Sequence, residues 1–199
     1  ALDDAGNGDT ASVVRSIDYA IAKGANIINL SFVSYSYSRT LHDAIKRAHD
    51  ANIIVLAPAG NESSAGEGIN LNIKPIYPAC YKDSNNKPLV VGVAATDAID
   101  QKAPFSGFGS SCISLSAPGV SFYSTAVYAP DKSINGQLFN EYYDGYWSGT
   151  SVAVPLVSGA LALLQGVNPS LSPQETIDIL LRNTDDINAL NPTYVNQLG

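Results

Sequence analysis

Helix-like and strand-like hydrophobic patterns alternate along the first half of the chain. Residues 26–31 are short, β-branched and mostly apolar, and residues 53–56 are apolar without interruption, which is typical of strands buried on both faces. Between them, residues 40–51 place four apolar side chains on one side of a helix. A strand, a helix and a second strand in this order imply a right-handed crossover and a parallel sheet covered by helices. The predicted fold class is therefore α/β.

Further segments extend this pattern on both sides. An amphipathic helix begins at Ser12 and ends at Gly24, and residues 89–94 are predicted as a third strand. Shorter strand-like pieces follow at residues 112–115 and 121–126. Because no internal repeat and no low-complexity linker divides the sequence, we expect one domain over residues 1–199.

Two helices are predicted near the C-terminus. Residues 151–165 are apolar all round, so this helix is expected to run through the core. The second helix begins at Ser172, where Pro173 suits the first helical position and Glu175 completes a capping box. The expected architecture is a parallel sheet flanked by helices.

The charge balance narrows the class of partners. The chain has 199 residues, with 18 acidic against 11 basic side chains and a net charge of −7. An acidic chain with dispersed charges repels a phosphate backbone, so we expect no nucleic-acid partner. No apolar run approaches the ~20 residues that a membrane helix requires, so we expect no membrane partner either. Two distant cysteines cannot form a zinc site alone, and no metal site is predicted.

Two loops lie where α/β folds place ligands, beyond a strand or at the start of a helix. Residues 59–62, Ala-Gly-Asn-Glu, either project the Asn61 amide into a crevice or form an ordinary turn. Ser151 opens the apolar helix, where free N–H groups and the positive end of the helix dipole can stabilise an oxyanion. The alternative is that Ser151 or Ser148 is simply the N-cap. A nucleotide-binding loop at residues 60–68 is disfavoured, because it fits neither G-x-G-x-x-G nor a P-loop.

Together these loops resemble the motifs of the subtilases, the subtilisin-like serine proteases. Residues 149–155, Gly-Thr-Ser-Val-Ala-Val-Pro, resemble the nucleophile motif Gly-Thr-Ser-Met-Ala-x-Pro, with Val152 in place of Met. Residues 59–61 resemble the Ala-Gly-Asn segment of the oxyanion hole. Other family landmarks are Ile28-Asn29-Leu30-Ser31, Tyr77-Pro78-Ala79, Val91-Gly92-Val93, Phe105-Ser106 and Ala117-Pro118-Gly119. The resemblance covers nearly the whole chain and implies the three-layer subtilisin-like architecture with its N-terminal portion missing.

The resemblance implies a serine endopeptidase that hydrolyses peptide bonds in peptide or protein substrates. Ser151 is then the nucleophile that attacks the scissile carbonyl. The side-chain amide of Asn61 and the backbone N–H of Ser151 bind the oxyanion. Such catalysis requires no cofactor. The family's calcium sites often draw on N-terminal loops without a counterpart here, so calcium has no support in this segment.

The general base and its orienting carboxylate have no counterpart in the sequence, although a serine nucleophile needs them. The family carries them in Asp-Ser/Thr-Gly and His-Gly-Thr motifs, and the nearest candidates, Asp9 and Asp83, lack the glycine. His42 and His49 are interpreted as solvated surface residues. The chain is therefore predicted to be a fragment, inactive alone, of a protease whose upstream part carries the Asp and the His. The alternative is a non-catalytic, subtilase-like peptide-binding module.

The family resemblance implies substrate contacts along two segments, residues 31–33 and residues 58–60. The family's edge strand continues Ser-Leu-Gly-Gly, whereas this chain has Val33 at the first glycine, which is expected to crowd the substrate backbone. Pro58 replaces a small residue and is expected to reshape the primary specificity pocket. The predicted substrate-binding residues are Ser31, Phe32, Val33, Pro58, Ala59 and Gly60.

A group of aromatic residues either lines an extended substrate cleft or packs its rings in surface loops, the interpretation we favour. These residues are Tyr35, Tyr37, Tyr142, Tyr143, Tyr146 and Trp147.

The spacing of Cys80 and Cys112 alone allows one disulfide or two buried thiols. The resemblance implies the disulfide, because the cysteines follow Tyr-Pro-Ala and precede Ala-Pro-Gly, where some secreted subtilases form one. Its 32-residue loop would contribute about 3.5–4 kcal/mol through chain entropy. A disulfide implies an extracellular or otherwise extracytoplasmic location.

Overall fold

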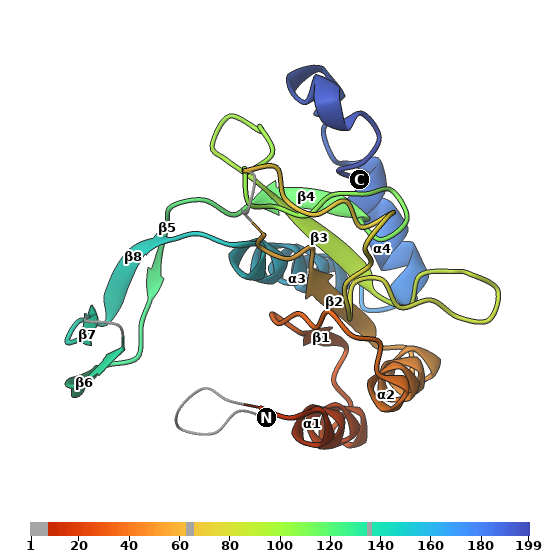
Figure 1. The fold of residues 1–199 in the computed structure, drawn as a ribbon. Helices are drawn as coiled ribbons and strands as arrows, with labels where there is room; N and C mark the ends of the chain where they lie inside the picture. The colour runs from red at the N-terminus through yellow and green to blue at the C-terminus, as the bar shows by residue number, and fades with distance from the viewer. Residues whose placement is uncertain (1–7, 63–65, 135–136) are drawn as a thin grey trace.

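A four-stranded parallel sheet forms the centre of the computed structural model, which describes residues 8–62, 66–134 and 137–199. The strands lie in the order β1-β2-β3-β4, so each pairs with the next along the sheet. Their bounds are Ile27–Asn29 (β1), Ile54–Pro58 (β2), Val91–Thr96 (β3) and Leu115–Pro118 (β4). Helices pack on both faces of this sheet (Figure 1), which confirms the α/β class.

Four α-helices and two short 3₁₀ helices accompany the sheet in the described residues. They are α1 (Thr10–Ala22), α2 (Arg39–Asp50), α3 (Thr150–Val167), α4 (Pro173–Arg182), η1 (Asn188–Leu190) and η2 (Pro192–Tyr194). α4 starts with the predicted capping box: the Ser172 hydroxyl accepts from the Glu175 N–H, and the Glu175 carboxylate accepts from the Ser172 N–H. Asp9 and Ser38 cap the starts of α1 and α2 through their side chains. These side chains satisfy N–H groups that a helix leaves unpaired at its start.

β2 is buried on both faces, because its side chains alternate between two layers. Val55 and Ala57 pack in the cluster formed with α1 and α2. Ile54 and Leu56 pack in the cluster formed with α3 and α4. This double burial explains why the sequence shows an uninterrupted apolar run there rather than an alternating one.

β4 begins three residues later than predicted. The strand expected at residues 112–115 starts instead at Leu115. The N–H groups of Cys112 and Ile113 bond to the Gly109 carbonyl in a turn, so these two residues do not join the strand ladder. Their side chains are buried in a third core cluster. Burial in a turn produces the same short apolar run as a strand, which is why the pattern was misleading here.

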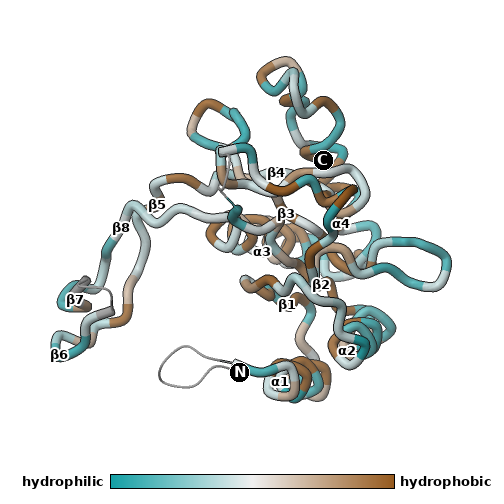
Figure 2. The backbone as a smooth tube through the Cα atoms, in the orientation of Figure 1, coloured by the Kyte–Doolittle hydropathy of each residue, from teal (hydrophilic) through white to brown (hydrophobic). Residues whose placement is uncertain are grey.

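α3 is only partly buried, so the prediction that it runs through the core is wrong for this chain. Ala153, Val157 and Leu161 pack against the sheet, but Leu163 is 74% exposed and Val167 is 87% exposed. Hydrophobic residues run along the helix in Figure 2. Its 18 residues are, by length and composition alone, enough to cross a membrane, contrary to the expectation that no apolar run approaches that size. A core helix of a soluble protein passes the same test, and one face of α3 packs on the sheet.

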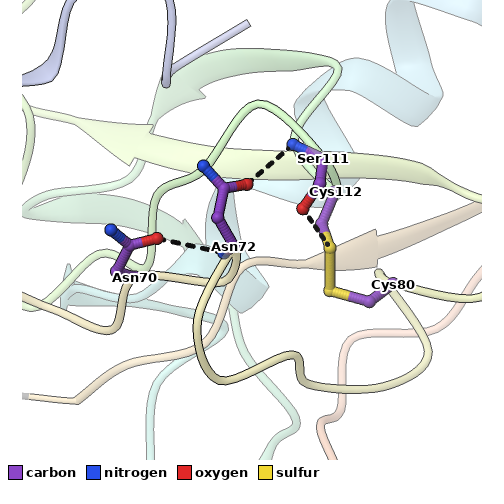
Figure 3. Close-up of a disulfide and its surroundings, with 5 residues drawn as sticks. All are labelled: Asn70, Asn72, Cys80, Ser111 and Cys112. Carbon is purple, nitrogen blue, oxygen red and sulfur yellow. Dashed lines mark hydrogen bonds between the residues drawn. A yellow bond between two sulfur atoms is a disulfide. The ribbon is translucent and has the colours of Figure 1, made fainter.

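Cys80 and Cys112 form a disulfide, with their Cα atoms 4.7 Å apart, as the resemblance implied. The bond joins the loop after β2 to the turn before β4 (Figure 3). Nearby, the Asn72 side-chain oxygen accepts the Ser111 N–H at 2.9 Å, and the Asn70 side chain accepts the Asn72 N–H at 3.0 Å. The disulfide and these two amides therefore fix the loop against the third core cluster.

An arm formed by residues 121–134 and 137–147 extends from the body of the molecule between β4 and α3 (Figure 1). It contains two antiparallel pairs. These are β5 (Phe122–Thr125) with β8 (Tyr143–Trp147), and β6 (Ala129–Ile134) with β7 (Gln137–Phe139). Of these strands, only β5 was predicted, at residues 121–126. The three core clusters contain no described residue of the arm, so hydrophobic periodicity could not reveal its other three strands.

Lys102 is a buried cation near the C-terminal segment. Its Nζ donates to the carbonyls of Ala103 and Ser106, each at 2.9 Å, and lies 4.7 Å from the centre of the Tyr194 ring. Burial lowers the pKa of Lys102 from 10.5 to about 8, although the nearby Glu67 carboxylate acts to raise it. Burial also raises the pKa of Tyr194.

We expect Lys102 to make the stability of the protein rise with pH between about 8 and 10.5. In this window the unfolded chain still holds the lysine proton and the folded chain has released it, so raising the pH favours the folded state. Urea unfolding from about pH 7.5 to 9.5 measures this rise, below the range where tyrosines ionise. Lys102→Met, which cannot titrate, is expected to lack it. Parallel curves of unfolding free energy against pH for the two proteins would contradict the prediction.

Candidate active site

Ser151 lies in the first turn of α3 and is half-buried. The N-cap of α3 is Gly149, which has no side chain to cap the helix, and the first N–H of the helix, that of Thr150, is instead accepted by the Asn61 side chain. The Ser148 hydroxyl instead accepts the N–H of Ser121 at 2.9 Å. The alternative that Ser151 or Ser148 serves as the N-cap is therefore wrong.

The backbone N–H of Ser151 is available to a ligand. Among the described residues no acceptor bonds to it, whereas the Thr150 N–H is taken by Asn61 and the Val152 N–H by the Gly149 carbonyl. Free N–H groups at a helix start carry partial positive charge and favour an anion beside them. The Ser151 hydroxyl therefore lies next to a donor that can bind a developing oxyanion.

The Asn61 side chain is held in one orientation by Thr150. Its Oδ1 accepts two hydrogen bonds from Thr150, from the backbone N–H and from the hydroxyl, both at 2.8 Å. The Thr150 hydroxyl in turn accepts the Gly60 N–H at 3.1 Å. Because the amide oxygen is committed to Thr150, the Nδ2 group is directed away from it and remains a donor.

Asn61 follows β2 directly, and the backbone around it is tied to the loop after β3. The Gly107 N–H donates to the Gly60 carbonyl at 3.0 Å, and the Glu62 N–H donates to the Phe105 carbonyl at 2.9 Å. Gly60 has a φ of +88°, and a Cβ there would lie 2.6 Å from Ile76 Cδ1. The turn that presents Asn61 therefore requires glycine at this position.

Gly149 marks the point on which the two candidate catalytic groups converge. A Cβ on Gly149 would lie 2.9 Å from Asn61 Nδ2 and 3.2 Å from Ser151 Oγ. Asn61 Nδ2 and Ser151 Oγ are thus each within about 3 Å of one position, the proximity that nucleophilic attack with oxyanion stabilisation needs. The Gly149 N–H donates to the Gly119 carbonyl at 2.8 Å, which fixes the turn.

The predicted substrate-binding residues fall into three groups by their exposure. Ser31 is exposed just after β1, and its hydroxyl donates to the Ser151 carbonyl at 3.0 Å, so it lies beside Ser151. Phe32 and Val33 are half-buried, and Val33 packs in the third core cluster. The remaining three residues, Pro58, Ala59 and Gly60, are buried. The structure therefore brings Ser31 to the site, whereas contact of the other five with substrate stays a prediction.

The histidines and the two candidate aspartates have roles elsewhere. His49 is exposed as expected, but His42 is partly buried, with its Nε2 2.9 Å from the Lys82 carbonyl and its ring against Tyr81. Asp9 caps α1, and the Asp83 side chain accepts N–H groups within its own turn. In the part of the chain that the structure describes, no histidine hydrogen-bonds to the Ser151 hydroxyl and no group of acidic, His or Cys residues could hold a metal ion.

Two residues that shape the site carried no role in the sequence interpretation. Thr150 is buried and orients Asn61, and Gly149 leaves the space between Asn61 and Ser151. Both lie inside the motif that pointed to Ser151. The signal in the sequence was the Gly-Thr dipeptide directly before the serine. The structural roles of these two residues become visible only in the fold, where the end of β2 lies beside the start of α3.

A parallel sheet covered on both faces, with a serine at a helix start and a fixed amide donor beside it, is the arrangement of α/β serine hydrolases. Within that class the chain belongs to the subtilase family, whose family model matches residues 1–198. This confirms the resemblance seen in the motifs.

Several relatives are recognisable over most of the chain. It is 33% identical to the minor extracellular protease Epr of Bacillus subtilis, over 94% of this chain and 25% of that protein. It is 38% identical to a thermostable alkaline protease of Halalkalibacterium halodurans, over 85% of this chain and 39% of that protein. With subtilisin DY of Bacillus licheniformis it shares 34% identity, over 87% of this chain and 55% of that protein. The chain thus spans between a quarter and just over half of these relatives.

A comparison with solved structures agrees with this family assignment at the level of the fold. The crystal structure of a cold adapted subtilisin-like serine proteinase superposes with a TM-score of 0.72 and 24% sequence identity. The match covers 93% of this chain and 58% of the other. This likeness confirms the subtilisin-like fold.

Proposed function

We propose that this chain is part of a serine endopeptidase of the subtilisin type, in which Ser151 attacks the scissile peptide carbonyl. The observation that carries the proposal is the orientation of Asn61. Two hydrogen bonds from Thr150 hold its amide oxygen and leave Nδ2 as a donor near Ser151 Oγ. The same bonds satisfy the first N–H of α3, so they join the end of β2 to the helix that carries Ser151.

The catalytic roles follow from this geometry. Ser151 Oγ adds to the substrate carbonyl and loses its proton to a general base, and the carbonyl oxygen becomes an oxyanion. Asn61 Nδ2 and the Ser151 N–H donate hydrogen bonds to that oxyanion. The tetrahedral intermediate expels the leaving amine after protonation by the same base, and water then hydrolyses the acyl-enzyme. The substrate is a peptide or a protein, and no cofactor takes part.

The general base and its carboxylate are proposed to come from the upstream part of the same protease. Two features support this. β1 is an edge strand that pairs only with β2 among the described residues, and α3 has the exposed apolar residues Leu163 and Val167. An open strand edge and an uncovered apolar helix face both favour a covering segment. An upstream segment on the open edge of β1 would lie next to Ser31 and Ser151.

An extracellular or otherwise extracytoplasmic location is also part of the proposal. The Cys80–Cys112 disulfide supports it, because such bonds persist in oxidising compartments. One relative is described as a minor extracellular protease.

Reaction with a fluorophosphonate probe tests this function. We expect the full-length protease to be labelled at Ser151, because the probe needs a serine activated by a base. The 199-residue chain alone is expected to remain unlabelled, because it lacks the triad Asp and His. Peptide mapping of the labelled protein identifies the modified serine.

Ser151→Ala in the full-length protein is the matched control and is expected to abolish labelling. A full-length protein that is folded by circular dichroism and still unlabelled would favour the non-catalytic peptide-binding module. Labelling of the isolated chain at Ser151 would instead show that the base lies within these 199 residues.

A further inference from the structure

The arm between β4 and α3 concentrates exposed aromatic rings. Eight of the 17 aromatic residues of the chain lie in it. Six large apolar or aromatic side chains of the arm are about half exposed or more: Tyr123, Val127, Tyr128, Tyr142, Tyr143 and Tyr146. None of them packs in a core cluster, so these rings do not serve the stability of the sheet. Exposed apolar patches of this kind mark interaction sites.

The rings are braced by the arm itself. The Tyr123 hydroxyl donates to the Tyr143 carbonyl at 3.2 Å. A Cβ on Gly145 would lie 2.9 Å from Tyr123 Cγ, so the Tyr123 ring packs directly over this glycine. Towards the tip, Tyr128 and Tyr142 stack with their centres 4.7 Å apart. Pre-organised rings lose little conformational entropy when a ligand binds, which favours a recognition surface.

The arm is continuous with the candidate active site. β8 ends at Trp147, and the chain runs from there through Ser148 and Gly149 to Ser151. The Ser148 hydroxyl bonds to the Ser121 N–H, which ties the bases of the two arm strands together beside the nucleophile. A ligand that extends from the site along β8 therefore meets the aromatic rings.

The open strand edges, aromatic side chains and charge of the arm favour an extended polypeptide as its ligand. Among the described residues β5 and β8 pair only with each other, so each has an open edge to which another strand can add. Tyrosine and tryptophan present an apolar ring with a polar tip, the residue types enriched where proteins bind one another. The arm has three acidic side chains, Asp131, Glu141 and Asp144, against Lys132. This balance disfavours anionic membranes and nucleic acids and suits uncharged or basic segments.

We propose that the arm is a second binding surface for the polypeptide substrate, which holds an extended, apolar or basic stretch beyond the residues that occupy the active site. The proposal rests on the endopeptidase function proposed above. It assigns to the arm a preference for long, unfolded chains over short peptides.

The kinetic test uses the full-length protease with Tyr142→Ser and Tyr146→Asn combined. Both side chains are among the most exposed of the arm, and asparagine tolerates the φ of +65° at position 146. We expect kcat/KM on reduced, alkylated lysozyme, an unfolded basic polypeptide, to fall about tenfold through KM. Cleavage of a tetrapeptide anilide is expected to be unchanged. The control Tyr19→Ser, on α1 and 65% exposed, is expected to change neither.

Equal losses on both substrates, or no loss on either, would overturn the proposal.

A second experiment measures binding and does not depend on catalysis. Full-length Ser151→Ala is titrated into fluorescently labelled, alkylated lysozyme, and the double tyrosine variant is expected to weaken binding about tenfold. Loss of this binding together with absent fluorophosphonate labelling of the parent protein would retain the arm as a binding surface and reject the protease function. Arm-dependent dimerisation in sedimentation, with unchanged polypeptide binding, would assign the arm to a second copy and overturn the proposal.

Discussion

Replacing Asn61 with alanine in the full-length protease that we propose is expected to lower kcat by about 10²- to 10³-fold. This magnitude is the one known for an oxyanion-hole asparagine of subtilisin, and it is carried over to Asn61 because its segment resembles that motif and the chain belongs to the same family. In the proposed mechanism the side-chain amide binds charge that develops only in the transition state, so KM is expected to change little. Steady-state hydrolysis of a tetrapeptide anilide measures both constants.

Substitutions of Thr150 test whether the rate depends on the orientation of the Asn61 amide. Thr150→Val removes one of the two bonds that hold Asn61 Oδ1 and is expected to lower kcat about tenfold, because a misdirected donor stabilises the oxyanion less well. Thr150→Ser keeps the hydroxyl and should restore most of the rate. In the Asn61→Ala background, Thr150→Val is expected to have little further effect on kcat, because the side chain that it orients is gone. Additive losses would contradict the role of Thr150 in orienting Asn61.

An exposed asparagine elsewhere supplies the matched control. Asn26 precedes β1, and its side chain is exposed. Asn26→Ala is expected to leave kcat and KM unchanged. A loss for Asn26→Ala similar to that for Asn61→Ala would show that the assay responds to stability rather than to oxyanion binding.

The sheet and its helices were predictable because local pattern and tertiary burial agree there. Residues 54–56 are apolar on both faces of β2, and α4 carries its own start signal in Ser172 and Glu175. The strand corresponding to β4 was predicted three residues too early, because Cys112 and Ile113 are buried in a turn. Burial alone does not distinguish a turn from a strand. Apart from β5, the strands of the arm escaped prediction for the opposite reason, since they bury little and leave no periodic apolar face.

The residues of the candidate site could be predicted from the sequence, but their arrangement in space could not. Ser151 and Asn61 were identified through motifs that resemble those of a family, and the structure brings them to one place. The hydrogen bonds from Thr150 to Asn61 join residues 89 positions apart in the sequence, so no local pattern encodes them. Similarly, the burial of α3 depends on which segments cover it, and the sequence of the helix does not contain that information.

Gly149→Ala is expected to lower kcat by about 10- to 10²-fold in the proposed full-length protease. The new Cβ would lie 2.9 Å from Asn61 Nδ2 and 3.2 Å from Ser151 Oγ, distances at which the neighbours must move. Displacing a donor and a nucleophile by fractions of an ångström misaligns both for the same transition state, and shifts near 1 Å cost about 10²-fold in rate. The rate of fluorophosphonate labelling is expected to fall in parallel with kcat.

A second glycine in the same helix separates crowding of the site from a general effect of the substitution. A Cβ on Gly159 would meet nothing within 4 Å, and the residue lies in the interior of α3. Gly159→Ala is therefore expected to raise stability by up to about 1 kcal/mol through helix propensity and to leave kcat unchanged. If Gly149→Ala retained full activity, Asn61 and Ser151 would have to act in positions other than those in this structure. The comparison thus tests whether the space beside Gly149 is where the oxyanion donor and the nucleophile meet the substrate.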